Sequence, residues 1–239
     1  MSKSNKVKEM FKSIAGRYDR GNTVLSLGIH HIWRKRLVQM SSRLHKAKKI
    51  LDCATGTGDL AIEWKRNSPQ STEVLGTDFC KEMLDKAPQK AQKESLDVDF
   101  EVCDLTDMPY ESNSFDIVSV AFGIRNVENV NKGIKELTRV LKPGGEFFVL
   151  EFGQPKSKII NHAYSTYSKK ILPKVGSMVT GNKEAYQYLE DSSAKFPCRE
   201  SFLALLRENA RFSELSYTSL SLGIAYIYRA VKEEIKASS

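Results

Sequence analysis

One stretch of sequence decides the fold, namely Asp52-Cys53-Ala54-Thr55-Gly56-Thr57-Gly58-Asp59. The residues from Lys48 to Ala54 have the apolar character of a buried strand, and a helical pattern runs from Asp59 to Arg66. Gly56 and Gly58 therefore lie in a turn between a strand and a helix, where absent side chains let backbone amides approach a ligand. Such a turn is typical of a parallel sheet that binds a nucleotide-like cofactor.

Strands and helices alternate along the rest of the chain. We predict strands over residues 71–78, 97–104, 115–122 and 146–152. Helices are predicted over 81–94, with Pro88 kinking it or starting a new turn, and over 131–141, where Lys142-Pro143-Gly144-Gly145 ends the helix. The pattern predicts an α/β fold with a doubly wound, Rossmann-like sheet.

The C-terminal part breaks this rhythm. Two β-rich runs, 214–222 and 224–231, meet at Gly223 and predict an antiparallel hairpin that closes the sheet. We expect a single domain over 1–239, with a cofactor-binding core at 46–154 and a C-terminal helix and hairpin at 199–239. The N-terminal helical segment 1–45 and the insertion 155–198 remain free to cover the carboxyl ends of the strands, so we interpret both as a lid.

Composition narrows the class of protein. The 239 residues are 41% hydrophobic and 28% charged, which is ordinary for a globular protein. No apolar run approaches the roughly 20 residues of a membrane span, and the N-terminus lacks the pattern of a secretory signal, so we expect a cytoplasmic protein. The net charge of +8 is compatible with nucleic acid, an anionic membrane or a solvated basic surface.

The four cysteines are widely separated. Cys53, Cys80, Cys103 and Cys198 form no Cys-x-x-Cys pair and have no histidine at metal-ligand spacing. Small buried thiols at strand ends are a common packing choice. We therefore expect inert, buried cysteines and no metal site.

The glycine turn alone fits two kinds of cofactor. Gly56-x-Gly58-x-x-Ala61 matches the dinucleotide fingerprint, and Asp78 follows Gly58 by 20 residues, the spacing of a ribose-binding acid. A nicotinamide-dependent oxidoreductase is therefore one hypothesis.

Acids at successive strand ends favour a second cofactor, S-adenosylmethionine. Asp52, Asp78 and Asp104 follow the first three strands of the core. This cofactor has no pyrophosphate but presents an ammonium, a ribose diol and an adenine amine, all of which donate hydrogen bonds to carboxylates. We further expect the Leu105 amide to contact an adenine ring nitrogen and Phe79 to cover the base. A terminal hairpin is also typical of class I methyltransferases.

Segments along nearly the whole chain resemble the ubiquinone/menaquinone biosynthesis C-methyltransferases. The resemblance rests on the glycine loop and on these segments: 11–19 (FKSIAGRYD), 26–36 (SLGIHHIWRKR), 122–127 (FGIRNV), 139–145 (RVLKPGG), 150–152 (LEF), 171–173 (ILP) and 186–189 (YQYL). The family methylates a ring carbon of a polyprenylated hydroquinone, and demethylmenaquinol is the acceptor we favour.

Carried over by position, the family's cofactor contacts fall on Thr57, Asp78, Asp104 and Leu105. A serine that the family often has after the fourth strand is replaced here by Ala121, so its hydrogen bond is missing. The candidate cofactor-binding residues are therefore Asp52, Gly56, Thr57, Gly58, Asp78, Phe79, Asp104, Leu105 and Ala121.

Methylation of a ring carbon needs an ionised ring hydroxyl. A guanidinium stays protonated in proteins, so Arg125, just past the fourth strand, is the candidate for stabilising the phenolate. Tyr18 and Asp19 are candidates for a polar lid contact or a proton relay, and His30 for accepting a proton. Each of these side chains has a purely structural alternative in packing or ion pairing.

A polyprenylated acceptor resides in a membrane. Basic and apolar residues interleave in the insertion as in an interfacial helix: Lys156, Lys158, Ile159, Ile160, Tyr164, Tyr167, Lys169, Lys170, Ile171, Leu172 and Lys174. Peripheral contact with the inner face of an anionic membrane is thus expected, with a solvated lid helix as the alternative. The sequence leaves a homodimer open. An RNA-methylating protein is disfavoured because no RNA-binding module is recognisable.

Overall fold

A seven-stranded sheet forms the centre of the computed structural model, which describes residues 3–168 and 182–234. The strand order is β3-β2-β1-β4-β5-β7-β6. Strands β1 to β5 run parallel, whereas β7 pairs antiparallel with β5 and β6. The strands span Lys49–Cys53 (β1), Glu73–Asp78 (β2), Asp99–Val102 (β3), Phe115–Ala121 (β4), Leu141–Phe152 (β5), Phe212–Leu220 (β6) and Ala225–Lys232 (β7).

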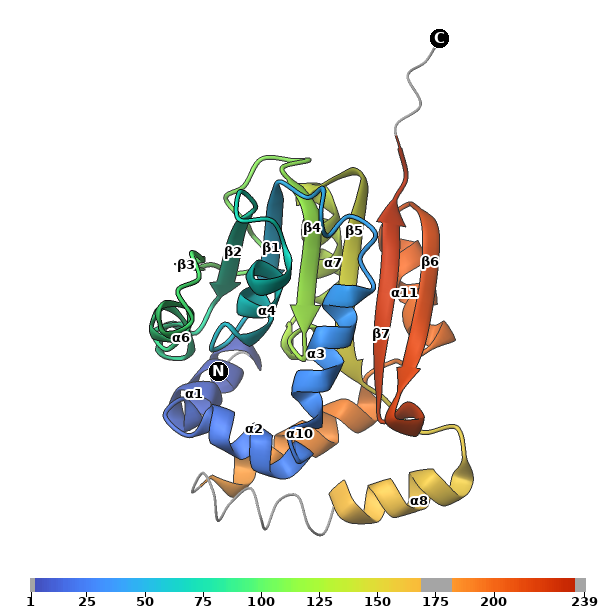
Figure 1. Ribbon diagram of the computed structural model, residues 1–239. Helices are drawn as coiled ribbons and strands as arrows, with labels where there is room; N and C mark the ends of the chain where they lie inside the picture. The colour runs from blue at the N-terminus through green and yellow to red at the C-terminus, as the bar shows by residue number, and fades with distance from the viewer. Residues whose placement is uncertain (1–2, 169–181, 235–239) are drawn as a thin grey trace.

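Helices cover both faces of the sheet, as Figure 1 shows. One face carries α3 (Ile29–Gln39) and α4 (Asp59–Asn67), and the other carries α7 (Val130–Val140) and α11 (Glu200–Asn209). Neighbouring residues of one strand serve opposite cores, because side chains alternate along a strand. Ile50 packs with the α3 and α4 core, and Leu51 packs with the α7 and α11 core. The predicted doubly wound α/β sheet is confirmed.

The remaining helices gather at the carboxyl ends of the parallel strands. These are α1 (Lys3–Ile14), α2 (Tyr18–Ser26), α8 (Lys158–Thr166) and α10 (Lys183–Lys195), together with the short η1 (Ile124–Asn126) after β4. In Figure 1 they lie below the strand arrowheads of β2 and β4. The N-terminal segment and the insertion thus meet at the end of the sheet where ligands bind in such folds.

The new turn expected at Pro88 within the helix 81–94 is confirmed, because this segment is divided into α5 (Lys81–Leu84) and α6 (Ala87–Lys93), with Pro88 in the first turn of α6. The expected break between α7 and β5 is wrong, because Leu141 already pairs with Phe115. The ladder then shifts register and resumes at Glu146, and Gly144 adopts the left-handed backbone (φ 69°) that a bulge requires.

The C-terminal hairpin and the cysteines agree with expectation. Strands β6 and β7 join through η3 (Ser221–Gly223), where Gly223 has a φ of 97°. Cys53, Cys80, Cys103 and Cys198 are all free and buried. Within 3–168 and 182–234, none of the helices combines the length and apolar character needed to cross a bilayer.

Candidate active site

A cavity of about 520 Å³ opens at the carboxyl ends of β1 and β4. It is enclosed by the glycine loop, α2, α3, α8 and α10. Its lining contains these candidate residues from the sequence: Tyr18, His30, Asp52, Gly56, Thr57, Ala121 and Arg125. The remaining candidates, Asp19, Gly58, Asp78, Phe79, Asp104 and Leu105, lie outside this lining.

The glycine loop holds its shape through left-handed backbone. Gly56 and Gly58 have φ values of 60° and 84°, which only glycine adopts readily. Gly58 is also the N-cap of α4, and a Cβ there would come within 2.7 Å of the Ala87 Cβ. A larger residue at Gly58 would therefore push α6 away from the loop. The loop leaves the α4 N-terminus close to the cavity.

Asp52 is a buried carboxylate that lines the cavity. Its Oδ2 accepts a hydrogen bond from Thr55 Oγ1 at 2.6 Å, and its Oδ1 accepts one from Ser119 Oγ at 2.7 Å. Trp64 Nε1 donates to the same Ser119 oxygen at 2.9 Å. Burial raises the pKa of Asp52 to about 7, although the Thr55 and Ser119 hydrogen bonds lower it in part. The chain Trp64-Ser119-Asp52 thus fixes one carboxylate beside the glycine loop.

Asp78 also holds the glycine loop in place. Its two oxygens accept from the Gly56 and Cys80 amides, each at 2.8 Å, and burial raises its pKa to about 6. Asp104 is exposed and accepts from the Thr106 amide at 2.8 Å, whereas Leu105 is buried. The three acids lie at or just after the carboxyl ends of three adjacent parallel strands, Asp52 at β1, Asp78 at β2 and Asp104 at β3.

Asp19 joins α2 to the cofactor loop. Thr57 Oγ1 donates to Asp19 Oδ1 at 2.6 Å, and Lys90 Nζ donates to Asp19 Oδ2 at 3.0 Å. Lys90 also pairs with Asp59 at the start of α4, and Asp59 pairs in turn with Arg34 of α3. This set of contacts, which we call the clasp, connects α2, α3, α4 and α6. Asp19 therefore faces the loop rather than the cavity.

Arg125 and Glu151 form a buried ion pair at the cavity. Arg125 Nη1 donates to Glu151 Oε1 at 2.7 Å, and the side chains are only 5% and 1% exposed. Burial raises the pKa of Glu151, against the opposing effect of the Arg125 charge. Arg125 Nη1 also donates to the Phe122 carbonyl at 2.6 Å, and its Nε donates to Ser192 Oγ at 3.3 Å.

Aromatic rings surround this guanidinium. Its Cζ lies 5.5 Å from the centroid of Phe152, and Phe122 lies 4.5 Å from Phe152 between ring centroids. Trp33 packs near both rings at 6.2 and 6.3 Å. Phe122 has a φ of 57°, a strained conformation for a bulky residue, and the Arg125 hydrogen bond helps to hold it. The site therefore combines one positive charge with flat apolar surfaces.

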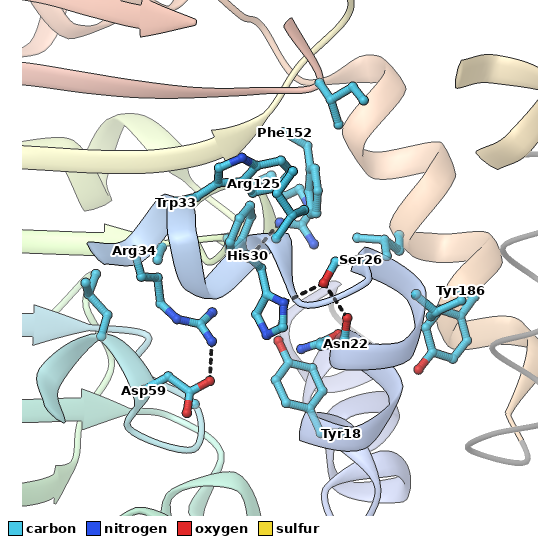
Figure 2. A pocket seen from close by; sticks show the side chains of 18 of the residues that line it. Tyr18, Asn22, Ser26, His30, Trp33, Arg34, Asp59, Arg125, Phe152 and Tyr186 are labelled. Atoms are coloured by element: carbon cyan, nitrogen blue, oxygen red, sulfur yellow. Dashed lines mark hydrogen bonds and ion pairs between the residues drawn. The ribbon is translucent and has the colours of Figure 1, made fainter. Parts of the chain in front are cut away.

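His30 and Tyr18 approach the cavity from α3 and α2, as Figure 2 shows. Ser26 Oγ donates to the Asn22 carbonyl at 2.7 Å and lies 2.5 Å from His30 Nδ1. Ser26 has a single hydroxyl proton, which it donates to the Asn22 carbonyl. The hydrogen bond between Ser26 Oγ and His30 therefore requires the imidazole proton to be on Nδ1. Burial and the nearby Arg34 charge lower the pKa of His30 to about 3. His30 is therefore neutral and a weak base.

One group in the described part of the chain has the spacing of metal ligands. It consists of His30, His31 and Asp59, whose ligand atoms lie within 4.8 Å of one another. The Asp59 carboxylate is already paired with Arg34 and Lys90, and these charges lower its pKa despite burial. Two neighbouring cations oppose the binding of a third, so we assign no metal here.

Several residues of the site, in the cavity lining or in contact with it, escaped the sequence analysis. Glu151 is a single acid at the end of an apolar strand, and that mismatch was the available signal. Ser119 lies inside a buried strand, and no pattern in the sequence distinguished it. Tyr164 and Tyr188 line the cavity from α8 and α10. Tyr188 stood within a family motif without an assigned role.

The doubly wound sheet, the glycine loop and the cavity at its carboxyl edge define a class I methyltransferase, the class of enzyme that takes its methyl group from S-adenosylmethionine. A family model described as the ubiE/COQ5 methyltransferase family matches residues 1–232. The chain belongs to this family.

Individual relatives agree. The ubiquinone/menaquinone biosynthesis C-methyltransferase UbiE of Bdellovibrio bacteriovorus is 52% identical over 93% of this chain and 94% of that protein. The demethylmenaquinone methyltransferase of Deinococcus radiodurans is 43% identical over 93% and 91%. Among solved structures, a SAM-dependent methyltransferase from Thermotoga maritima matches with a TM-score of 0.67 and 18% identity, covering 94% of this chain and 99% of that one. That structural match supports the fold alone.

Proposed function

We propose that this protein methylates a ring carbon of a polyprenylated hydroquinone, with demethylmenaquinol as the favoured acceptor. The observation that carries the proposal is the buried Arg125, whose guanidinium lines an aromatic cavity beside the glycine loop. A positive charge among flat apolar rings suits an aromatic acceptor that becomes negatively charged as it reacts. The names of the relatives point to the same acceptor class.

The glycine loop is the proposed cofactor end of the cavity. S-adenosylmethionine supplies an electrophilic methyl group there. Asp52 has a buried carboxylate facing the cavity, which suits the ammonium of the cofactor's amino acid part. Asp78 and Asp104 are proposed for the ribose and the adenine amine, with Leu105 and Phe79 beside the base. Asp78 would then exchange its present amide contacts with Gly56 and Cys80 for ligand hydroxyls, or share them.

Arg125 defines the proposed acceptor end. A ring hydroxyl titrates near pH 10, so ionising it at pH 7 costs roughly 4 kcal/mol. Arg125 reduces this cost by stabilising the phenolate, and Phe122 and Phe152 hold the ring flat beside it. With the cofactor bound, the ring carbon would form its bond to the methyl group as the sulfur–methyl bond breaks. The same carbon would then lose its proton to water, and the ring would regain aromaticity.

The N-terminal segment and the insertion are the proposed lid. Their helices contribute the apolar side of the cavity, and the clasp secures α2 and α3 to the cofactor loop. Exclusion of water protects the methyl donor and strengthens the Arg125 charge. Asp19 acts in this proposal by closing the lid.

The rim of this cavity is the proposed membrane contact. Leu27, Ile159 and Leu222 are 93%, 83% and 72% exposed, and each belongs to or adjoins the cavity lining. Lys156 and Lys158 lie beside Ile159. Exposed apolar side chains, with basic residues beside one of them, suit the surface of an anionic bilayer. The other predicted interfacial residues, Lys169, Lys170, Ile171, Leu172 and Lys174, lie outside the described residues.

Flotation with liposomes tests this contact. We expect the protein to float with vesicles that contain anionic lipid and the L27S/L222S variant to float less. Equal recovery of both proteins in the floating fraction would remove the rim from the interface.

Mass spectrometry of cellular quinones tests the acceptor. A cell that lacks the protein should accumulate the unmethylated precursor, and the identity of this precursor names the substrate. Calorimetry with S-adenosylhomocysteine and NAD tests the cofactor. Binding of NAD without binding of S-adenosylhomocysteine would contradict the proposal and support an oxidoreductase.

A further inference from the structure

Three tyrosines from three different helices line the cavity together with Arg125. Tyr18 comes from α2, Tyr164 from α8 and Tyr188 from α10, and all three line the cavity. The Arg125 charge lowers the pKa of each hydroxyl, although burial has the larger effect and raises it. Their hydroxyls therefore remain protonated donors at neutral pH and lie within the electrostatic reach of the guanidinium.

Tyr188 differs from Tyr18 in its hydrogen bonding. The Tyr18 hydroxyl bonds with Asn22. The Tyr188 hydroxyl is buried and has no hydrogen-bond partner among the described residues. A buried polar group without a partner is uncommon and is usually completed by a ligand or water. Tyr188 lines the same cavity as Arg125, and the charge of Glu151 also acts on its hydroxyl.

Two further unsatisfied atoms belong to the ion-pair partner and to the chain neighbour of Arg125. Glu151 Oε2 and Asn126 Oδ1 are buried without partners in the described part of the chain. Ser192 lies one turn beyond Tyr188 on α10 and accepts from Arg125 Nε. The face of α10 that carries Tyr188 is therefore held against Arg125. The Tyr188 hydroxyl is therefore the unpartnered polar group among these that belongs to the cavity lining in the described part of the chain.

We infer that Tyr188 donates a hydrogen bond to the ring oxygen of the acceptor, beside the guanidinium of Arg125. This inference rests on the proposed function, because it requires an acceptor with a ring hydroxyl. Tyr188 and Arg125 together then orient the ring and stabilise its ionised form. Glu151 acts as a positioning residue, because it holds the guanidinium from the side away from the cavity.

The variant Tyr188→Phe removes only the hydroxyl and tests this inference. Tyr217→Phe on β6 is the matched control, because the Tyr217 hydroxyl donates to Glu200 of α11 and lies outside the cavity lining. Binding is measured by calorimetry with a short-chain alkyl naphthalenediol, kept reduced, and with the alkylnaphthalene that lacks both hydroxyls. The affinity for S-adenosylhomocysteine reports whether each variant retains an intact site.

We expect Tyr188→Phe to bind the diol about tenfold more weakly or worse, with unchanged affinity for the hydrocarbon and for S-adenosylhomocysteine. Its kcat/KM with demethylmenaquinol should fall similarly, and the pH at which the rate reaches half its maximum should rise. Tyr217→Phe should match the wild type throughout. An equal loss for diol and hydrocarbon would show a packing role and overturn the inference.

Failure of the inference and failure of the proposed function give different results. A wild-type enzyme that methylates demethylmenaquinol together with an unimpaired Tyr188→Phe variant overturns only the inference. A wild type that neither binds the diol nor methylates demethylmenaquinol overturns both.

Discussion

Arg125 and Glu151 are joined by a 2.7 Å hydrogen bond between Nη1 and Oε1, in a pair that is almost completely buried. The second oxygen of Glu151 has no partner among the described residues, while its first also accepts from the Phe152 amide at 2.9 Å. Glu151 therefore fixes the orientation of the Arg125 guanidinium and leaves this group accessible from the cavity.

Removing the charge of Glu151 should destabilise the protein. Glu151→Gln leaves Arg125 buried without its counter-charge, and we expect a loss of about 3 kcal/mol in the free energy of unfolding. The double variant R125M/E151L replaces the pair with apolar groups and should recover most of this loss without recovering methyl transfer. Chemical denaturation measures the free energy of unfolding of the single and the double variant. A double variant less stable than Glu151→Gln would contradict this account of the pair.

Cofactor affinity should depend on pH through Asp52. Its pKa of about 7 means that the carboxyl is protonated below that pH, and binding of an ammonium requires the ionised form. Affinity should therefore increase by about tenfold from pH 6 to pH 8 in the wild type. Calorimetry with S-adenosylhomocysteine should show a weaker pH dependence in Asp52→Asn. The same dependence in both proteins would assign the titration to another group.

Opening the clasp should affect cofactor retention more than chemistry. The Asp19 side chain is 44% exposed, so its ion pair with Lys90 contributes less than about 1 kcal/mol. We expect Asp19→Asn to release S-adenosylhomocysteine a few-fold faster and to increase hydrogen exchange in α2, with kcat nearly unchanged. A kcat that collapses while release stays normal would instead support a proton relay through Asp19.

His30 should not set the pH dependence of the reaction. With a pKa of about 3 it stays neutral throughout the physiological range. The imidazole signals of His30 in an NMR titration should therefore not move between about pH 5 and pH 8. Titration near pH 6 would return His30 to the list of proton acceptors.

Local patterns predicted most of the fold. Apolar strands, helical spacing and the Gly56/Gly58 turn act over short stretches, and their order determined the doubly wound sheet. The start of β5 was missed because the pairing of Leu141 with Phe115 is a contact between distant segments. Local turn signals at Lys142 to Gly145 could not show that the ladder continues through a bulge.

Site residues were predictable from the sequence where they belong to one short motif. Asp52 and Gly56 belong to the glycine loop, and Arg125 to a family motif. The partners of these residues are far away in sequence: Glu151 lies 26 residues from Arg125, and Lys90 lies 71 residues from Asp19. Only the folded chain shows that Asp19 contacts Thr57, or that Tyr188 and Arg125 line the same cavity. Contacts between residues so far apart leave no periodic pattern in the sequence.

Methyl transfer to demethylmenaquinol by purified wild-type and Arg125→Ala proteins, both saturated with S-adenosylmethionine, tests the central claim most directly. Mass spectrometry should detect menaquinol with the wild type. The variant should turn over about a hundredfold to a thousandfold more slowly, with nearly unchanged affinity for S-adenosylhomocysteine. Unchanged turnover in Arg125→Ala, or no menaquinol from the wild type, would contradict the account.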